Sequence, residues 1–259
     1  MTDKPPILEL KGVSKSFGAV QALYEVDFHV SRGEVMALVG DNGAGKSTLI
    51  KCIAGIHPID DGEILFEGSE VKIHGPKDAA ALGIEVVYQD LALADNLDVV
   101  QNMYLGREEL GTLRRLDETA MEKRASETLK SLSVTTIRSV RQTVAGLSGG
   151  QRQSVAVAKA VMWNSRVVIL DEPTAALGVA QTKQVLDLVG RLGEQGLAVV
   201  LISHNLHDIF QVADSITVLR LGQNVKEFKR RETNQQEVVE AITAGQLSKV
   251  PGQSEEAVA

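Results

Sequence analysis

The sequence contains a single cysteine, Cys52, among 259 residues, so no disulfide can form within the chain. One unpaired cysteine is typical of a reducing compartment. Aromatic residues make up only 3% of the sequence, which predicts a core of aliphatic side chains. No apolar run approaches the roughly 20 residues that span a bilayer, and residues 1–6 are polar rather than signal-like. We therefore expect a cytoplasmic protein that reaches a membrane only through other chains.

Positive charge is also scarce. The chain has 27 Lys and Arg against 34 Asp and Glu, which gives a formal net charge of −7. Binding along a nucleic-acid backbone needs clustered cationic side chains, so no nucleic-acid partner is expected. Hydrophobic residues at 44% and charged residues at 24% are the balance of an ordinary globular protein. The length suits one large domain or a domain with an inserted subdomain.

Apolar patterns predict strands on both sides of a region that has none. The predicted strands cover residues 7–17, 26–30, 35–39, 64–67, 71–73, 84–87, 167–170, 197–202 and 216–219. The predicted helices cover residues 46–55, a segment bracketed by Pro76 and Gly83, and residues 118–132, 151–163 and 179–195. Alternating strands and helices predict a mainly parallel sheet with helices on its faces. From residue 90 to about 140 the strand signals stop, which indicates a helical insertion.

A glycine-rich segment, GDNGAGKS at residues 40–47, follows an apolar strand and opens a helix. Glycine lets such a loop point its N–H groups at phosphate oxygens, and the helix N-terminus adds a positive dipole end. Lys46 is predicted to reach the β- and γ-phosphates, Ser47 to ligate Mg²⁺, and Thr48 to contact the α-phosphate. An accidental glycine-rich turn is the alternative, and the strand–loop–helix context argues against it. The predicted phosphate-binding residues are Gly40, Asn42, Gly43, Ala44, Gly45, Lys46, Ser47 and Thr48.

Two carboxylates follow the buried strand at residues 167–170. Asp171 is predicted to face the same Mg²⁺ as Ser47. Glu172 is predicted to polarise the water that attacks the γ-phosphate. The alternative for Glu172 is a cap on the following loop, although Pro173 already shapes that turn.

Between these two motifs lies the segment Leu147-Ser148-Gly149-Gly150-Gln151, with Ser148 placed as a helix cap. The three motifs, in this order, resemble those of the ATP-binding cassette transporter family over about residues 7–245. The resemblance implies an ATPase that uses ATP and Mg²⁺ and works as a head-to-tail homodimer. The signature residues Ser148, Gly149, Gly150 and Gln151 would then contact ATP held by the other copy. Small residues at 149 and 150 suit a close approach of backbone to phosphate.

Three further residues acquire a role only from this resemblance. Gln89 is similar to a glutamine that contacts Mg²⁺ and the nucleophilic water. His204 is similar to a histidine that contacts the γ-phosphate, and its alternative is an ordinary residue at a strand end. Phe17 is similar to an aromatic residue that stacks on adenine, and its alternative is a place in the core.

The resemblance also implies an architecture. We expect an α/β fold with a P-loop NTPase (RecA-like) core, an N-terminal antiparallel β subdomain and an inserted α-helical subdomain. The whole chain would be one cassette domain. Residues 1–89 and 164–245 would form the nucleotide-binding core, residues 90–163 the helical signature subdomain, and residues 246–259 a flexible tail.

One departure from the family pattern is Gly178, where the family commonly has an aspartate that helps to connect the two ATP sites. Gly178, together with the sequence around Gln89 and at residues 103–106, is similar to the sequence of the ATPases of bacterial monosaccharide importers of the ribose, xylose and fructose types. Permease subunits would dock near residues 89–102 and hold the chain at the inner face of the membrane, with a periplasmic sugar-binding protein as an indirect partner. The alternatives are a cassette ATPase of DNA maintenance or translation, and a weakly hydrolysing regulatory cassette.

Overall fold

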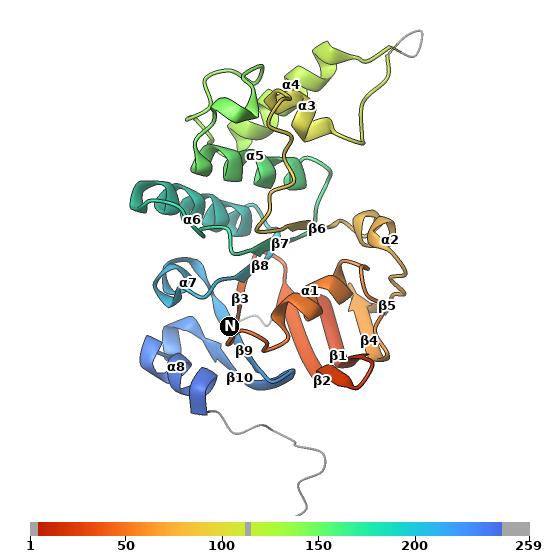
Figure 1. Cartoon of the computed structure of the whole chain (residues 1–259), viewed down its shortest axis with the longest axis vertical. Helices are drawn as coiled ribbons and strands as arrows, with labels where there is room; N and C mark the ends of the chain where they lie inside the picture. Colours follow the sequence, from red (N-terminus) through yellow and green to blue (C-terminus); the bar gives the residue numbers. More distant parts are fainter. Residues whose placement is uncertain (1–4, 112–114, 245–259) are drawn as a thin grey trace, which may run out of the picture.

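The structure is a computed structural model that describes residues 5–111 and 115–244. The tail predicted for residues 246–259 lies outside the described residues. Two sheets and the helices around them make up the fold (Figure 1). This arrangement confirms the α/β class and the antiparallel N-terminal sheet that the sequence predicts.

The larger sheet has six strands in the order β10-β9-β3-β8-β7-β6. Its members are β3 (Val35–Val39), β6 (Ile84–Val87), β7 (Val167–Asp171), β8 (Ala198–Ile202), β9 (Ser215–Arg220) and β10 (Gln223–Lys229). Neighbouring strands are parallel except for β10, which runs antiparallel to β9 at one edge. The apolar run predicted at 35–39 is therefore a central strand with both faces covered, as continuous apolar strands in parallel sheets are.

The smaller sheet has four antiparallel strands in the order β2-β1-β4-β5, namely β1 (Pro6–Phe17), β2 (Val20–Ser31), β4 (Asp61–Phe66) and β5 (Ser69–Glu70). The strand predicted at 71–73 is wrong, because β5 ends at Glu70. Glu67 and Gly68 both have positive φ, at 51° and 78°, which is the backbone of a tight two-residue hairpin turn. That turn pairs Phe66 directly with Ser69, so the second strand begins at once.

The helices are α1 (Lys46–Ile53), α2 (Pro76–Ala81), α3 (Val99–Tyr104), α4 (Glu118–Ser131), α5 (Gly149–Val161), α6 (Val179–Glu194), α7 (Leu206–Val212) and α8 (Gln235–Ala244). Helices α3, α4 and α5 gather at one end of the molecule, beyond the edge of the six-stranded sheet (Figure 1). The helices predicted at 46–55, 118–132 and 179–195 are confirmed within two residues at each end. Helices α3, α7 and α8 and strand β10 were not predicted.

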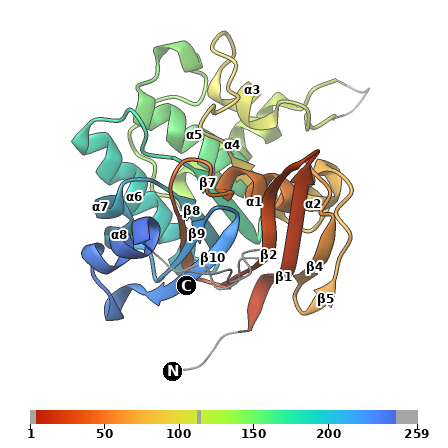
Figure 2. The ribbon, with the colours of Figure 1, turned by 60° about the horizontal axis from the view of Figure 1, so that its bottom comes forward.

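Alternation along the strands divides the core between the two faces of the larger sheet. Met36, Leu38 and Ile169 point to a cluster shared with α1 and the smaller sheet. Val168 and Leu170 point the opposite way and pack with α5 and α6. In Figure 2 the smaller sheet stands on the far side of α1 from the six-stranded sheet. The core thus fixes both the start of α1 and the ends of β7 and β8, where the candidate site lies.

Among the described residues, none of the helices is both long and apolar enough to cross a bilayer.

Cys52 lies on α1 and is 1% exposed. Burial raises the pKa of its thiol to about 11, so about one thiol in a thousand is ionised at pH 8. We predict that a maleimide leaves Cys52 unmodified in the native chain at pH 8 and modifies it completely in denaturant. Mass spectrometry after timed labelling checks this. Fast labelling of the native chain would mean that the packing around α1 is loose.

Candidate functional site

Strand order brings four distant segments to one edge of the larger sheet. Strands β3, β8, β7 and β6 are consecutive neighbours and run parallel, so their carboxyl ends share that edge. The glycine-rich loop follows β3, and His204 follows β8. Asp171 ends β7, and Gln89 follows β6. The site residues predicted from separate motifs therefore meet because of the sheet's topology.

These segments enclose a cleft of about 940 Å³. Its lining includes the predicted residues Gly40, Asn42, Gly43, Ala44, Gly45, Lys46, Ser47, Thr48, Gln89, Asp171, Glu172 and His204. Asp41, Ile202 and the start of β2, Val20-Gln21-Ala22, complete the lining. The last three residues were not predicted, because the apolar alternation places the start of this strand only at residue 26. The signal was available, since Phe17-Gly18-Ala19 has the composition of a hairpin turn.

The glycine-rich loop has a shape that its sequence requires. Gly40 has φ 151°, and a Cβ there would lie 2.1 Å from the carbonyl oxygen of Leu219 on β9. Any side chain at this position would push the loop off the neighbouring strand. The loop leads directly into α1, so the N-terminus of that helix faces the cleft. Backbone N–H groups and the helix dipole make this end of the cleft suited to an anion.

Lys46 lies at the first position of α1 and turns back onto the loop. Its Nζ donates to the carbonyl oxygens of Gly40, at 2.6 Å, and Asp41, at 3.0 Å. Burial lowers the pKa of Lys46, and the charges of Glu172, Asp41 and Asp171 partly offset this. The cleft therefore holds a partly desolvated cation whose charge interacts with three carboxylates.

Asp171 and Glu172 lie next to each other at the end of β7. Burial raises the pKa of the Asp171 carboxyl, and the neighbouring charge of Glu172 raises it further. Glu172 has φ 51°, a conformation that is uncommon for a residue with a side chain, and its N–H donates to Ile202 on β8 at 2.9 Å. Its Oε2 lies 2.8 Å from Nδ1 of His204. The side chain of Glu172 is 17% exposed and that of His204 is 77% exposed, so the pair reaches from the sheet to the surface.

The donor set at this edge fits a hard cation. The Ser47 hydroxyl, the Gln89 amide and the Asp171 carboxylate all offer oxygen atoms to the same cleft. Mg²⁺ prefers such oxygen ligands and keeps part of its shell for water and phosphate. Phosphate oxygens and water would complete the shell of a cation held there.

Ser148 lies outside the cleft and caps α5. Its Oγ accepts from the N–H of Gln151 at 3.4 Å, while Oε1 of Gln151 accepts from the N–H of Ser148 at 2.9 Å. This reciprocal pair is a capping box, and it confirms the cap that the sequence predicts. Nε2 of Gln151 also donates to the carbonyl of Thr136 at 2.6 Å. The predicted nucleotide contact of Gln151 would therefore compete with bonds inside the chain.

Neighbouring residues of the same chain leave little room for a side chain at Gly149 and Gly150. A Cβ on Gly149 would lie 2.9 Å from Cδ2 of Leu177, and a Cβ on Gly150 would lie 3.1 Å from Cβ of Gln181. Small residues here let α5 pack closely on the start of α6 and the loop before it. This packing is a second reason for glycine, besides the approach to phosphate that the sequence suggests. At the start of α6, the N–H of Gly178 donates to Oε1 of Gln181 at 3.4 Å.

Phe17 lies at the end of β1, outside the lining of the cleft. The residue is 44% exposed, and its ring contacts the His57 ring edge to face, with centroids 5.0 Å apart. The alternative place in the core is therefore wrong for Phe17, because an interior ring would be covered on all sides. Stacking on adenine stays a prediction.

Residues 23–175 match the protein family described as ABC transporter. The chain is 46% identical over 244 residues to a xylose/arabinose import ATP-binding protein of Sulfolobus acidocaldarius, covering 94% of this chain and 96% of that protein. It is 48% identical over 226 residues to a fructose import ATP-binding protein of Rhizobium meliloti, covering 85% and 87% of the two chains. Against a ribose import ATP-binding protein of Yersinia pestis it is 41% identical, but it spans only 48% of that protein.

Solved structures have the same fold. A nucleotide-free ATP-binding cassette from an ABC transporter superposes with a TM-score of 0.79 at 25% identity, over 92% of this chain and 98% of that one. A dimeric cassette in a post-hydrolysis state, bound to ADP and Pi, superposes with a TM-score of 0.72 at 27% identity, over 87% and 100% of the two chains.

Proposed function

This chain belongs to the ABC transporter family, and on that premise we propose that it is the ATP-hydrolysing subunit of a monosaccharide importer. The observation that carries the proposal is the meeting of Lys46, Asp171, Glu172 and His204 in one cleft at the carboxyl edge of the sheet. Relatives that the chain matches almost end to end are named for the import of xylose and arabinose or of fructose.

ATP would lie with its phosphates against the glycine-rich loop and the N-terminus of α1. Lys46 would exchange the carbonyl oxygens of Gly40 and Asp41 for phosphate oxygens, which are stronger partners for an ammonium group. Ser47, Gln89 and Asp171 would hold Mg²⁺. The ion supplies charge neutralisation for the transferred phosphoryl group.

Glu172 would act on the attacking water. Its carboxylate accepts and orients a proton of the water, while the contact with Nδ1 of His204 fixes the side-chain direction. With a proton on each ring nitrogen, His204 would donate from Nδ1 to Glu172 and from Nε2 to the γ-phosphate. Phosphoryl transfer depends mainly on such positioning and on charge, since the chemistry itself needs little covalent help.

A second copy would complete the site. Ser148 and the N-terminus of α5 do not line the cleft of their own chain, and Ser148 is exposed. A head-to-tail pair would bring each signature segment to the other copy's ATP, with N–H groups and a helix dipole facing the γ-phosphate. The related cassette bound to ADP and Pi is described as dimeric.

The remaining partners follow from the importer assignment. Permease subunits would dock near residues 89–102, where Gln89, Asp90, Asp95 and Asn96 are exposed, and they would hold the chain at the inner face of the membrane. A periplasmic sugar-binding protein would deliver the solute to them. We also propose the division into a nucleotide-binding core, residues 1–89 and 164–245, and a signature subdomain, residues 90–163.

We predict that Lys46→Ala lowers ATP affinity about 10- to 100-fold, because it removes a charge-assisted contact to phosphate. Equilibrium dialysis with labelled ATP measures this. Lys11→Ala, which removes an exposed lysine of β1 away from the cleft, is the control and should leave the affinity unchanged. Equal affinity of Lys46→Ala and the parent chain would contradict the assigned contact.

Sugar uptake by cells tests the importer assignment. In cells that lack this chain, we expect uptake of labelled xylose, fructose or ribose to fall, and the intact chain but not Glu172→Gln to restore it. Undiminished uptake of all three sugars and of other monosaccharides would refute sugar import. Restoration by Glu172→Gln would show that hydrolysis does not drive uptake.

A further inference from the structure

Asn102 on α3 is a polar side chain with no exposed surface. Its Oδ1 accepts from the N–H of Ala94 at 2.7 Å. Its Nδ2 lies within hydrogen-bond distance of the carbonyl oxygens of Ala94 at 3.0 Å, Asp98 at 3.0 Å and Leu97 at 3.3 Å. A buried amide that is fully engaged in this way fixes the backbone that it contacts. Here that backbone is the 94–98 loop, a segment without regular secondary structure.

The 94–98 loop in turn holds the 142–147 segment, which leads directly to Ser148. The N–H of Val144 donates to the carbonyl of Leu97 at 3.0 Å, and the N–H of Ala145 donates to the carbonyl of Asp95 at 3.0 Å. The Leu97 carbonyl is therefore shared between the Asn102 amide and the 142–147 segment. From within, that segment is organised by a single 3₁₀ turn, Val144–Gly146, and by a bond from Nε2 of Gln142 to the carbonyl of Gly146 at 3.3 Å.

Arg152, one turn into α5, binds both the 94–98 loop and the 142–147 segment. Its guanidinium contacts Oδ1 of Asp95 at 2.9 Å and the carbonyls of Leu147 and Ala145 at 3.3 Å each. Both the loop and the approach to Ser148 are thus tied to α5. Without these bonds an irregular segment of this kind would open locally at little cost.

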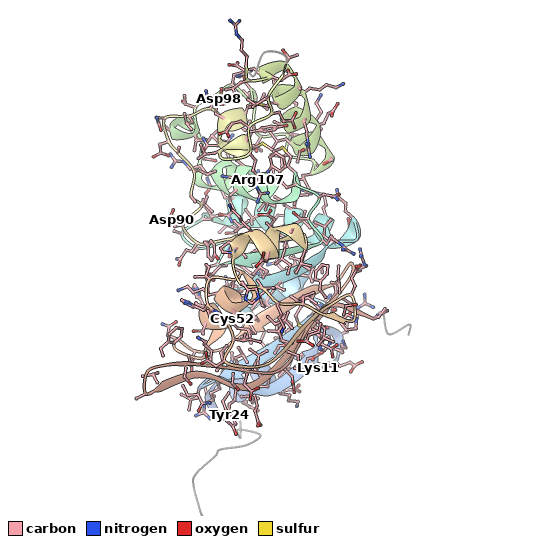
Figure 3. The ribbon with its side chains drawn as sticks, turned by 90° about the vertical axis from the view of Figure 1, so that its right-hand side faces the viewer. Lys11, Tyr24, Cys52, Asp90, Asp98 and Arg107 are labelled. Carbon is pink, nitrogen blue, oxygen red and sulfur yellow. The ribbon has the colours of Figure 1, made fainter. Side chains whose placement is uncertain are left out.

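The 94–98 loop also occupies a defined place between the cleft, which Gln89 lines, and the helical end that carries Ser148. Asp90, just after Gln89, lies where the helical end meets the sheets, whereas Asp98 at the end of the loop lies well inside the helical end (Figure 3). The predicted permease-docking range ends at Asn102, but Asn102 is buried and cannot itself contact a partner.

We propose that Asn102 is a positioning residue for the signature segment. Its side chain fixes the 94–98 loop, the loop fixes the 142–147 segment, and this segment presents Ser148 and the N-terminus of α5 in one orientation to the second copy's ATP. The inference rests on the proposed function, in which Ser148 acts on the other copy.

Asn102→Asp is the decisive variant, since its carboxylate still accepts from Ala94 but cannot donate to the three carbonyls. Two quantities are measured on the full chain: the Kd for ATP, and the ATPase rate per chain as the chain concentration is varied. The parent should reach half its maximal rate at a definite chain concentration. We expect Asn102→Asp to raise the chain concentration at half-maximal rate by about tenfold or more, because one or two buried hydrogen bonds are lost. The Kd for ATP should stay within about twofold, because the cleft does not include Asn102.

Asp95→Ala is the milder companion, and we expect it to fold even if Asn102→Asp does not, because the Asp95 side chain is 63% exposed. It should raise the chain concentration that gives half the maximal ATPase rate by about threefold, because one partly exposed ion pair is lost. Glu127→Ala removes an exposed carboxylate on α4 at the same end of the molecule, away from the 94–98 loop, and it should cause no shift.

Three results with the variants would overturn the inference. The first is a folded Asn102→Asp chain whose ATPase rate depends on chain concentration as the parent's does. The second is a loss of ATP affinity that parallels the loss of rate. The third, where Asn102→Asp does not fold, is an Asp95→Ala chain whose ATPase rate depends on chain concentration as the parent's does. A parent chain whose rate per chain does not depend on concentration would instead refute the two-chain site. That failure is visible before any substitution is made, and it would overturn the inference with it.

Discussion

Glu172→Gln is expected to lower the rate of ATP hydrolysis by about 10²- to 10⁴-fold, the range found when a positioned general base is lost. The amide has the same size as the carboxylate, so the unusual backbone of residue 172, with φ 51°, has no new reason to change. It cannot take a proton from water, and it replaces the charged partner of His204 Nδ1.

ATP affinity should stay within about twofold of the parent, because the main phosphate contacts come from the loop and Lys46. Single-turnover hydrolysis and equilibrium ATP binding on the same preparation separate the two effects. Glu194→Gln, the same change at an exposed position at the end of α6, is the control. Hydrolysis within tenfold of the parent, an effect of about 1.4 kcal/mol on the barrier, would remove Glu172 from the role of base.

Ser148→Arg is expected to abolish hydrolysis while a single chain still binds ATP. The residue is exposed and lies outside the cleft, so its own chain's ATP does not contact it. The substitution removes the cap of α5, worth about 1 kcal/mol to the helix, and places a long cation at the positive end of the helix dipole. A bulky side chain there would also hold the second copy away from the phosphate.

Ser131→Arg is the matched control, because Ser131 is an exposed serine at the end of α4 in the same helical part. It should hydrolyse ATP at the parent's rate. The measurement is the steady-state rate of each variant beside its Kd for ATP. Substantial hydrolysis by Ser148→Arg would show that one chain assembles a complete site.

Much of this site could be predicted from local sequence, because each motif carries its own geometry. The glycine-rich loop at 40–47, the paired carboxylates at 171 and 172, and the cap at Ser148 are each defined by a few adjacent residues. The strands that carry the first two are continuous apolar runs, and β3 was placed to the residue. Structure is predicted most reliably from local patterns of this kind.

The rest depends on contacts between distant residues. Nothing local shows that β8 lies between β3 and β7, although this order brings His204 to within 2.8 Å of Glu172. Helix α3 has only six residues, and its stability comes from the Asp98 cap and from the burial of its apolar residues. The role of Asn102 was also invisible, because its partners at 94–98 matter only through their contact with 144 and 145.

The central claim is that two copies of this chain form each ATP site, and sedimentation equilibrium of Glu172→Gln tests it most directly. This variant should trap ATP without consuming it. With ATP and Mg²⁺ it should sediment with the mass of two chains, and without ATP with the mass of one. The double variant Glu172→Gln/Ser148→Arg should remain at one chain in both conditions. A Glu172→Gln chain that binds ATP and stays a single chain at every concentration would contradict the account.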